Sequence, residues 1–250
     1  MGWTIRNMAA ALVRFTNSKT EMARTKSSAS GVSFFKVLLF PFKLVIGLVL
    51  PFVLLIRCSV FMYTQFQWNA WLCLSVGTIA TFICIFIYLN YFSRMISGKK
   101  KARREGARKR NLIVAGLLVA FFVGYVLLFL GVSNAKTTSV RGEYYTVHPL
   151  LRMAVGSLIV FDRSLVITDM SRVPADYQDM GLAVKGNSLH YPQQDGFVHA
   201  LDLRTNDRPE WQNQMRETIF KLLGFRTLRH TGTEDHLHVS LMIHENPGAL

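Results

Sequence analysis

Three long apolar blocks constrain the fold of this chain more than any other feature. They cover about Phe34–Tyr63, Trp71–Phe92 and Leu112–Gly131, and the third contains no charged residue. A helix of about 20 apolar residues is long enough to cross the roughly 30 Å hydrocarbon core of a bilayer. We therefore predict three transmembrane helices within residues 34–132.

The charges flanking these blocks predict the orientation of the chain. Residues 1–33 carry five Lys/Arg and one acid, and residues 93–111 carry nine Lys/Arg and one acid. Such basic segments stay in the cytoplasm. An odd number of spans then delivers residues 133–250 to the periplasmic or extracellular side. We predict a multi-pass protein of the cell inner (cytoplasmic) membrane whose partners are the lipid bilayer and other membrane proteins.

The net charge of +14 does not indicate a nucleic-acid partner. Residues 133–250 hold twelve Lys/Arg against thirteen Asp/Glu, so the basic excess lies in the membrane half. The three cysteines also lie there, in or beside the apolar blocks, whereas all seven histidines lie after residue 132. A disulfide framework and a thiolate nucleophile are therefore excluded for the C-terminal region.

Residues 133–250 have the pattern of a mixed α+β domain. The expected helices are 150–160, 174–180 and 208–223, and the expected strands are 165–168, 197–203 and 236–243. For the last helix we expect Asp207 as the N-cap and Gly224 after its end. Its buried face is expected to contain Trp211, Phe220 and Leu223.

The stretch from Glu234 to Met242 carries the most suggestive chemistry. Apolar and polar residues alternate there as in a half-buried strand, so His236 and His238 should share one face. Two imidazoles and one carboxylate form a common zinc site. His190 and Asp202, the latter on an expected strand, are candidates to complete such a set.

Four short motifs occur in an order typical of one family of zinc peptidases. They are Ser171-Arg172 with Gln178, Ser188-Leu189-His190, Ala200-Leu201-Asp202 and His236-Leu237-His238. The region from about 150 to 242 thereby resembles the zinc peptidases that include D-Ala-D-Ala carboxypeptidases, penicillin-insensitive murein endopeptidases and L-alanyl-D-glutamate endolysins. The hedgehog signalling domain shares their fold. The resemblance implies a hedgehog/D-Ala-D-Ala-peptidase-like α+β domain that hydrolyses peptide bonds of cell-wall peptidoglycan.

The resemblance also implies roles for individual residues. His190, Asp202 and His238 would bind Zn²⁺. The general base would be Asp235 or Glu234, and the sequence leaves this choice open. The other two roles fall to His236, which would hydrogen-bond the oxyanion or substrate, and to Arg172, which would stabilise a carboxylate or developing negative charge.

The chain departs from the family pattern around the first ligand. Eleven residues separate His190 from Asp202 where the family usually has six, which predicts an extra loop at Tyr191–Gly196. His199 is a competing ligand, but it lies three residues before Asp202 and should face the other way. An alternative function is therefore a catalytically inactive domain of the same fold that acts as a binding or structural subunit of a membrane complex. The remaining histidines are assigned structural or surface roles: His148, His230 and His244.

The predicted orientation can be tested with reporter fusions. Alkaline phosphatase fused after Leu250 should be active, because residues 133–250 are expected outside the cytoplasm. The same reporter fused within the basic loop 93–111 should be inactive and serves as the control. A cytoplasmic readout at Leu250 would contradict the topology and remove peptidoglycan from reach.

Overall fold

The structure is a computed structural model that describes residues 34–97, 101–179, 181, 183–184, 186–232 and 235–242. The basic segment 1–33 and the candidates Glu234 and His244 lie outside the described residues. Residues 47–250 form one compact unit. Helix α2 begins before this unit, and its residues before Gly47 belong to a separate unit.

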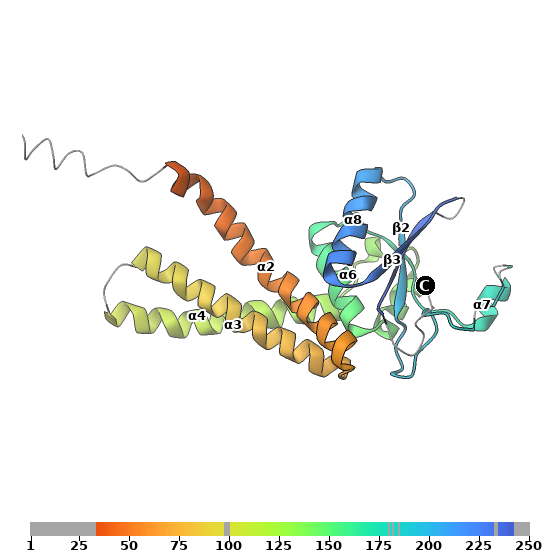
Figure 1. The fold of residues 1–250 in the computed structure, drawn as a ribbon, viewed down its shortest axis with the longest axis horizontal. Helices are drawn as coiled ribbons and strands as arrows, with labels where there is room; N and C mark the ends of the chain where they lie inside the picture. Colours follow the sequence, from red (N-terminus) through yellow and green to blue (C-terminus); the bar gives the residue numbers. More distant parts are fainter. Residues whose placement is uncertain are drawn as a thin grey trace, which may run out of the picture. The chain divides into compact units, whose positions relative to one another are not determined.

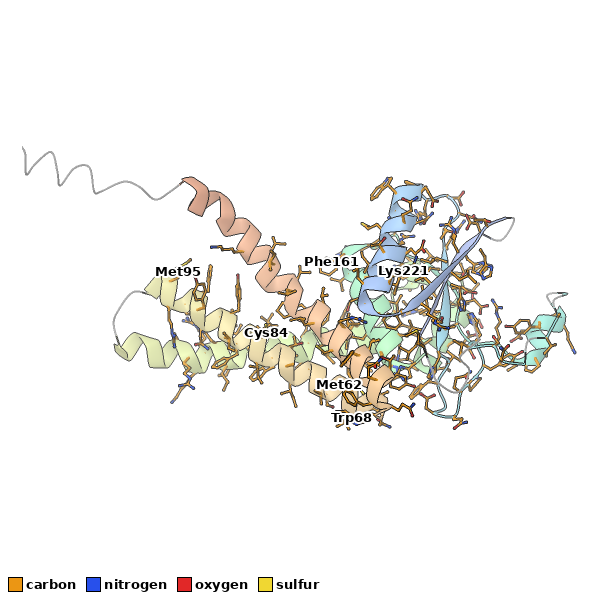
Figure 2. All side chains as sticks on the ribbon, viewed as in Figure 1. Met62, Trp68, Cys84, Met95, Phe161 and Lys221 are labelled. Carbon is orange, nitrogen blue, oxygen red and sulfur yellow. The ribbon has the colours of Figure 1, made fainter. Side chains whose placement is uncertain are left out.

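Three long apolar helices account for the first half of the described chain. They are α2 (Phe34–Phe66), α3 (Ala70–Ser97) and α4 (Lys101–Leu128), and α3 and α4 run side by side (Figure 1). Each contains a stretch long and apolar enough to cross a membrane: Val45–Phe66, Ala70–Met95 and Gly106–Leu128. Large apolar side chains project outward along these stretches, as on α3 between Cys84 and Met95 (Figure 2). The predicted three membrane-compatible helices are thus confirmed.

Buried polar contacts join the helices to one another. The Ser59 hydroxyl on α2 donates to the Cys73 carbonyl on α3 at 3.1 Å, and the Asn111 amide on α4 donates to the Ser93 hydroxyl on α3 at 2.9 Å. Interhelical hydrogen bonds of this kind stabilise helix packing where lipid offers no alternative partner.

A helix-and-sheet region follows the apolar helices, as the sequence predicts. Its helices are η1 (Val132–Asn134), α5 (Thr138–Gly142), η2 (Glu143–Thr146), α6 (Pro149–Phe161), α7 (Pro174–Asp179) and α8 (Glu210–Leu223). Its strands are β1 (Ile167–Asp169), β2 (Ala200–Arg204), β3 (Arg226–His230) and β4 (His236–Ser240). They form an antiparallel sheet in the order β1-β2-β4-β3. Strand β3 was not predicted, because its sequence Arg-Thr-Leu-Arg-His holds one apolar residue and shows no apolar/polar alternation.

The two faces of the sheet have different roles. Leu201 and Leu203 of β2, with Leu237 and Val239 of β4, are buried in the core together with residues of α6 and α8. Side chains alternate along a strand, so the intervening residues of β2 and β4 face the opposite side. That opposite face carries the candidate site.

Helix α8 shows two correct and two wrong expectations. Phe220 and Leu223 are buried and Gly224 ends the helix in the left-handed region with φ of 99°, as expected. Trp211, however, is 66% exposed, because the buried face follows Asn213, Arg216, Phe220 and Leu223, and Trp211 lies two residues off that register. The N-cap is Pro209, whereas the Asp207 carboxylate pairs with Arg204 at 2.8 Å.

The C-terminal region packs directly on the ends of the apolar helices. The Tyr144 hydroxyl donates to the Val126 carbonyl at 2.6 Å, and buried Arg152 of α6 donates to the Leu127 carbonyl at 3.1 Å. These carbonyls belong to the last turn of α4. The carbonyl groups of a helix's last turn have no hydrogen-bond donors within their own helix. One hydrophobic core joins both regions, and its members from α2, α3 and the end of α4 are Leu55, Ile56, Val60, Leu74, Val126, Leu127 and Leu130. The boundary predicted at residue 133 is a change in composition and not a break in packing.

Candidate metal centre

Three of the predicted site residues meet at the sheet face opposite α6 and α8. The Nδ1 atom of His238 lies 2.8 Å from Asp202 Oδ1. The Nε2 atom of His190 lies 3.3 Å from His238 Nδ1 and 3.4 Å from Asp202 Oδ1. All three residues are at least 95% buried, and together they form a group that could hold a metal ion.

Strand register brings two of these ligands together. Asp202 of β2 and His238 of β4 are direct cross-strand partners, so their side chains emerge side by side on one face. His190 comes from the loop before β2 instead. Its carbonyl accepts the Arg172 N–H at 3.0 Å, and the neighbouring Leu189 carbonyl accepts the His199 N–H at 2.9 Å, which ties this loop to the sheet.

The hydrogen bonds of His190 select the tautomer that a metal ligand needs. Its Nδ1 atom lies 2.8 Å from the Met170 carbonyl oxygen, which can only accept a hydrogen bond. The neutral ring therefore carries its proton on Nδ1 and leaves the Nε2 lone pair directed at Asp202 and His238. Outer-shell contacts of this type orient metal-binding histidines in many proteins.

The spacing of the three donor atoms fits a small tetrahedral ion. Donor atoms on zinc bonds of about 2.0–2.1 Å lie about 3.3 Å apart in a tetrahedral site. Two of the three donor–donor distances, 3.3 and 3.4 Å, match this value. The third, between His238 Nδ1 and Asp202 Oδ1, is shorter at 2.8 Å because these two atoms are joined by a direct hydrogen bond. The residues present therefore fit a metal ion.

The charges around the triad favour its ionised carboxylate. Burial alone would raise the pKa of Asp202, but His190 and His238 hold that pKa well below its usual range. Burial alone would lower the pKa of His190, and Asp202 more than offsets this, so the pKa of His190 is raised. A cation held between these groups would take the place of the histidine proton.

Arg172 lies at the edge of the triad. It pairs with Asp169, donates from Nη2 to Asp202 Oδ2 at 3.0 Å, and lies 5.3 Å above the Tyr177 ring. His236 lies on the same side, with Nε2 3.7 Å from Asp202 Oδ2. The structure thus brings Arg172 and His236 beside the three candidate ligands.

A cavity of about 400 Å³ lies beside the triad, and Asp202 of the triad lines it together with His236 and Arg172. Most of the remaining charged residues on its walls are acidic: Glu143, Asp169, Asp176 and Asp179, against Lys136. The cavity therefore has a negative wall around one guanidinium group.

The two residues expected to supply a general base have different outcomes. Asp235 accepts hydrogen bonds from Arg229 Nη2 at 2.6 Å and from the Thr205 hydroxyl at 2.9 Å. Because Asp235 and His236 are adjacent, the carboxylate lies on the α8 side of the sheet, away from the triad. This placement does not favour Asp235 as the base. Glu234 lies outside the described residues.

Glu143 is a candidate that sequence reasoning missed. It begins η2, lines the cavity, and accepts the Ser171 N–H at 3.3 Å beside Arg172. Partial burial raises the pKa of Glu143, and the nearby charges of Asp169 and Asp176 add to this effect. No local motif marks this residue, since it lies 28 positions before Ser171 in the chain.

His199 does not join the triad. As expected for a residue three positions from Asp202, it faces the other side of the sheet, where it contacts Asp195 at 2.9 Å. His190 is the histidine that lies beside Asp202.

No family model, curated protein or solved structure matches the chain.

Replacement of His238 with Ala should weaken metal binding at the triad, which zinc can report. The loss in affinity should exceed the roughly 10- to 100-fold that removal of an outer-shell partner costs. Competition with a chelating indicator, using the full chain in detergent, measures this affinity. His230→Ala is the matched control, since His230 stacks on His236 at 4.7 Å but is not a member of the group His190, Asp202 and His238 that could hold the ion. Equal loss in both variants would contradict the assigned ligand set.

Proposed function

We propose that this chain is a membrane-anchored zinc peptidase that hydrolyses peptide bonds of cell-wall peptidoglycan. The observation that carries the proposal is the convergence of three separated motifs on one buried triad. His190, Asp202 and His238 come from the Ser-x-His, Ala-x-Asp and His-x-His motifs, and their donor atoms lie 2.8 to 3.4 Å apart. Convergence of motifs that share an order with a zinc-peptidase family supports the hedgehog/D-Ala-D-Ala-peptidase-like assignment of the domain.

His190, Asp202 and His238 would hold the ion. When bound, a zinc ion lowers the pKa of a coordinated water and polarises a peptide carbonyl. Arg172 directs its guanidinium group to the cavity edge of Asp202, where it would stabilise negative charge that develops on the substrate oxygen. His236, which lines the same cavity, would donate a hydrogen bond to the substrate.

Glu143 is the general base in this proposal. A base needs a carboxylate in the same cavity as the reacting groups and a pKa near the working pH. Glu143 lines the cavity, and its pKa is raised, which brings it closer to a neutral working pH. The pKa of Asp235 is instead lowered by its hydrogen bond with Arg229. Glu143 would accept the proton of the attacking water and return it to the leaving amine.

The acidic wall of the cavity limits the substrates that would bind. Asp176 and Asp179 of α7 add negative charge beside Arg172. Such a wall favours a peptide that presents a free amino group and disfavours a strongly acidic one. The carboxyl end of the peptide would then lie toward Arg172.

Glu143→Gln tests the proposed base. The zinc-loaded full chain in detergent should release peptides from purified peptidoglycan, and this substitution should lower the rate by about two to four orders of magnitude while zinc affinity stays unchanged. Mass spectrometry of the soluble products measures the rate. Glu210→Gln is the control, because Glu210 is exposed and its described ionic partner is Arg229 at 3.6 Å, outside the cavity.

Two other outcomes have defined meanings. If Glu234→Gln loses cleavage and Glu143→Gln does not, the base is Glu234 and the peptidase function stands. If the wild-type chain binds zinc but releases no peptide, the peptidase proposal fails, and a catalytically inactive binding or structural subunit of a membrane complex is favoured.

A further inference from the structure

A second cluster of metal-type ligands lies apart from the triad. His199 Nε2 is 3.0 and 2.9 Å from the two carboxylate oxygens of Asp195, and His148 Nε2 is 3.5 Å from Asp195 Oδ2. The three residues meet the same spacing as the triad, with one donor atom each within 4.8 Å of the others. The two groups share no residue.

The cluster joins three separate parts of the chain. His148 is the N-cap residue of α6, and His199 immediately precedes β2. Asp195 comes from the Tyr191–Gly196 loop, the insertion that lengthens the segment between His190 and Asp202. A single group of donor atoms thus links the membrane-proximal helix, the central sheet and the inserted loop.

Both imidazole groups are buried almost completely. The exposed fraction is 0% for His148 and 1% for His199. The Tyr63 ring of α2 packs against them, 4.8 Å from His148 and 6.2 Å from His199.

The hydrogen bonds of the cluster leave His148 Nε2 without a partner. This atom is buried and makes no hydrogen bond with the described residues, although Asp195 lies 3.5 Å away. Buried polar atoms are rarely left unsatisfied in folded proteins. A cation between His148, Asp195 and His199 satisfies this atom and neutralises the half-exposed carboxylate.

We propose that His148, Asp195 and His199 form a second metal site that binds a divalent zinc-type ion. Two imidazoles and a carboxylate suit such an ion. Binding at His148 Nε2 moves the remaining ring proton to Nδ1, which gives up the long 3.3 Å hydrogen bond from the Leu150 N–H. Binding at His199 Nε2 likewise moves its proton to Nδ1 and ends its hydrogen bond to Asp195. Two metal–nitrogen bonds thus replace this hydrogen bond and one weak cap contact.

The role of this site is structural. The metal would hold the Tyr191–Gly196 loop against the start of α6 and the start of β2. Because the Tyr191–Gly196 loop follows His190 directly, metal in the second site holds the segment that carries a triad ligand. Loss of this metal should therefore loosen the loop without removing a donor from the triad.

Zinc titration of the metal-free full chain in detergent tests the proposal. We expect two zinc equivalents per chain for the wild type. His199→Ala and Asp195→Asn should each bind one equivalent, and His238→Ala should bind the other. The double variant His199→Ala/His238→Ala should bind none. Asp195→Asn changes a half-exposed loop side chain with little change in shape, so it serves if His199→Ala does not fold, as judged by circular dichroism and thermal melting.

The outcomes separate this site from the triad. One equivalent in the wild type that His238→Ala abolishes and His199→Ala and Asp195→Asn retain overturns the second site and leaves the triad intact. One equivalent that Asp195→Asn abolishes and His238→Ala retains supports the second site and removes the basis of the proposed peptidase. His230→Ala should bind two equivalents, and a loss there would show that the counts do not report the assigned ligands.

Discussion

The pairing of β2 with β4 is the constraint on which the site depends. Asp202 and His238 are direct partners in this antiparallel ladder, and a shift of one residue between the two strands would put these side chains on opposite faces of the sheet. The apolar residues on either side of Asp202 and His238 hold this register, because Leu201, Leu203, Leu237 and Val239 must all face the core. Burial of apolar side chains on one face therefore positions the candidate metal ligands on the other.

The site is also tied to the membrane helices. Tyr144 and Arg152 bind the last carbonyls of α4, and the same segment continues through η2, which carries Glu143, into α6, whose N-cap is His148. Helix α4 thereby sets the position of a candidate base and of a second candidate metal ligand. Three membrane-compatible helices do more here than anchor a domain, since their ends form part of its core.

Sequence periodicity was sufficient for the parts of the structure that depend on local pattern. The apolar blocks predicted α2, α3 and α4, and alternation on a strand placed His236 and His238 together and turned His199 away from Asp202. The same alternation puts Asp235 on the face opposite His236. The expectation that Asp235 is a general base rested only on its position three residues before His238 and did not take this alternation into account. Strand β3 and Glu143 depend on tertiary contacts: β3 lacks alternation, and Glu143 reaches the cavity only because η2 packs beside Ser171.

X-ray absorption at the zinc edge tests the central claim, that the triad is a metal centre. The full chain carrying His199→Ala isolates the triad from the second proposed site. We predict nitrogen and oxygen ligands only, with the outer-shell scattering of two imidazole rings. A sulfur ligand at about 2.3 Å, which would implicate Cys58, Cys73 or Cys84, or a spectrum without imidazole scattering would contradict the account.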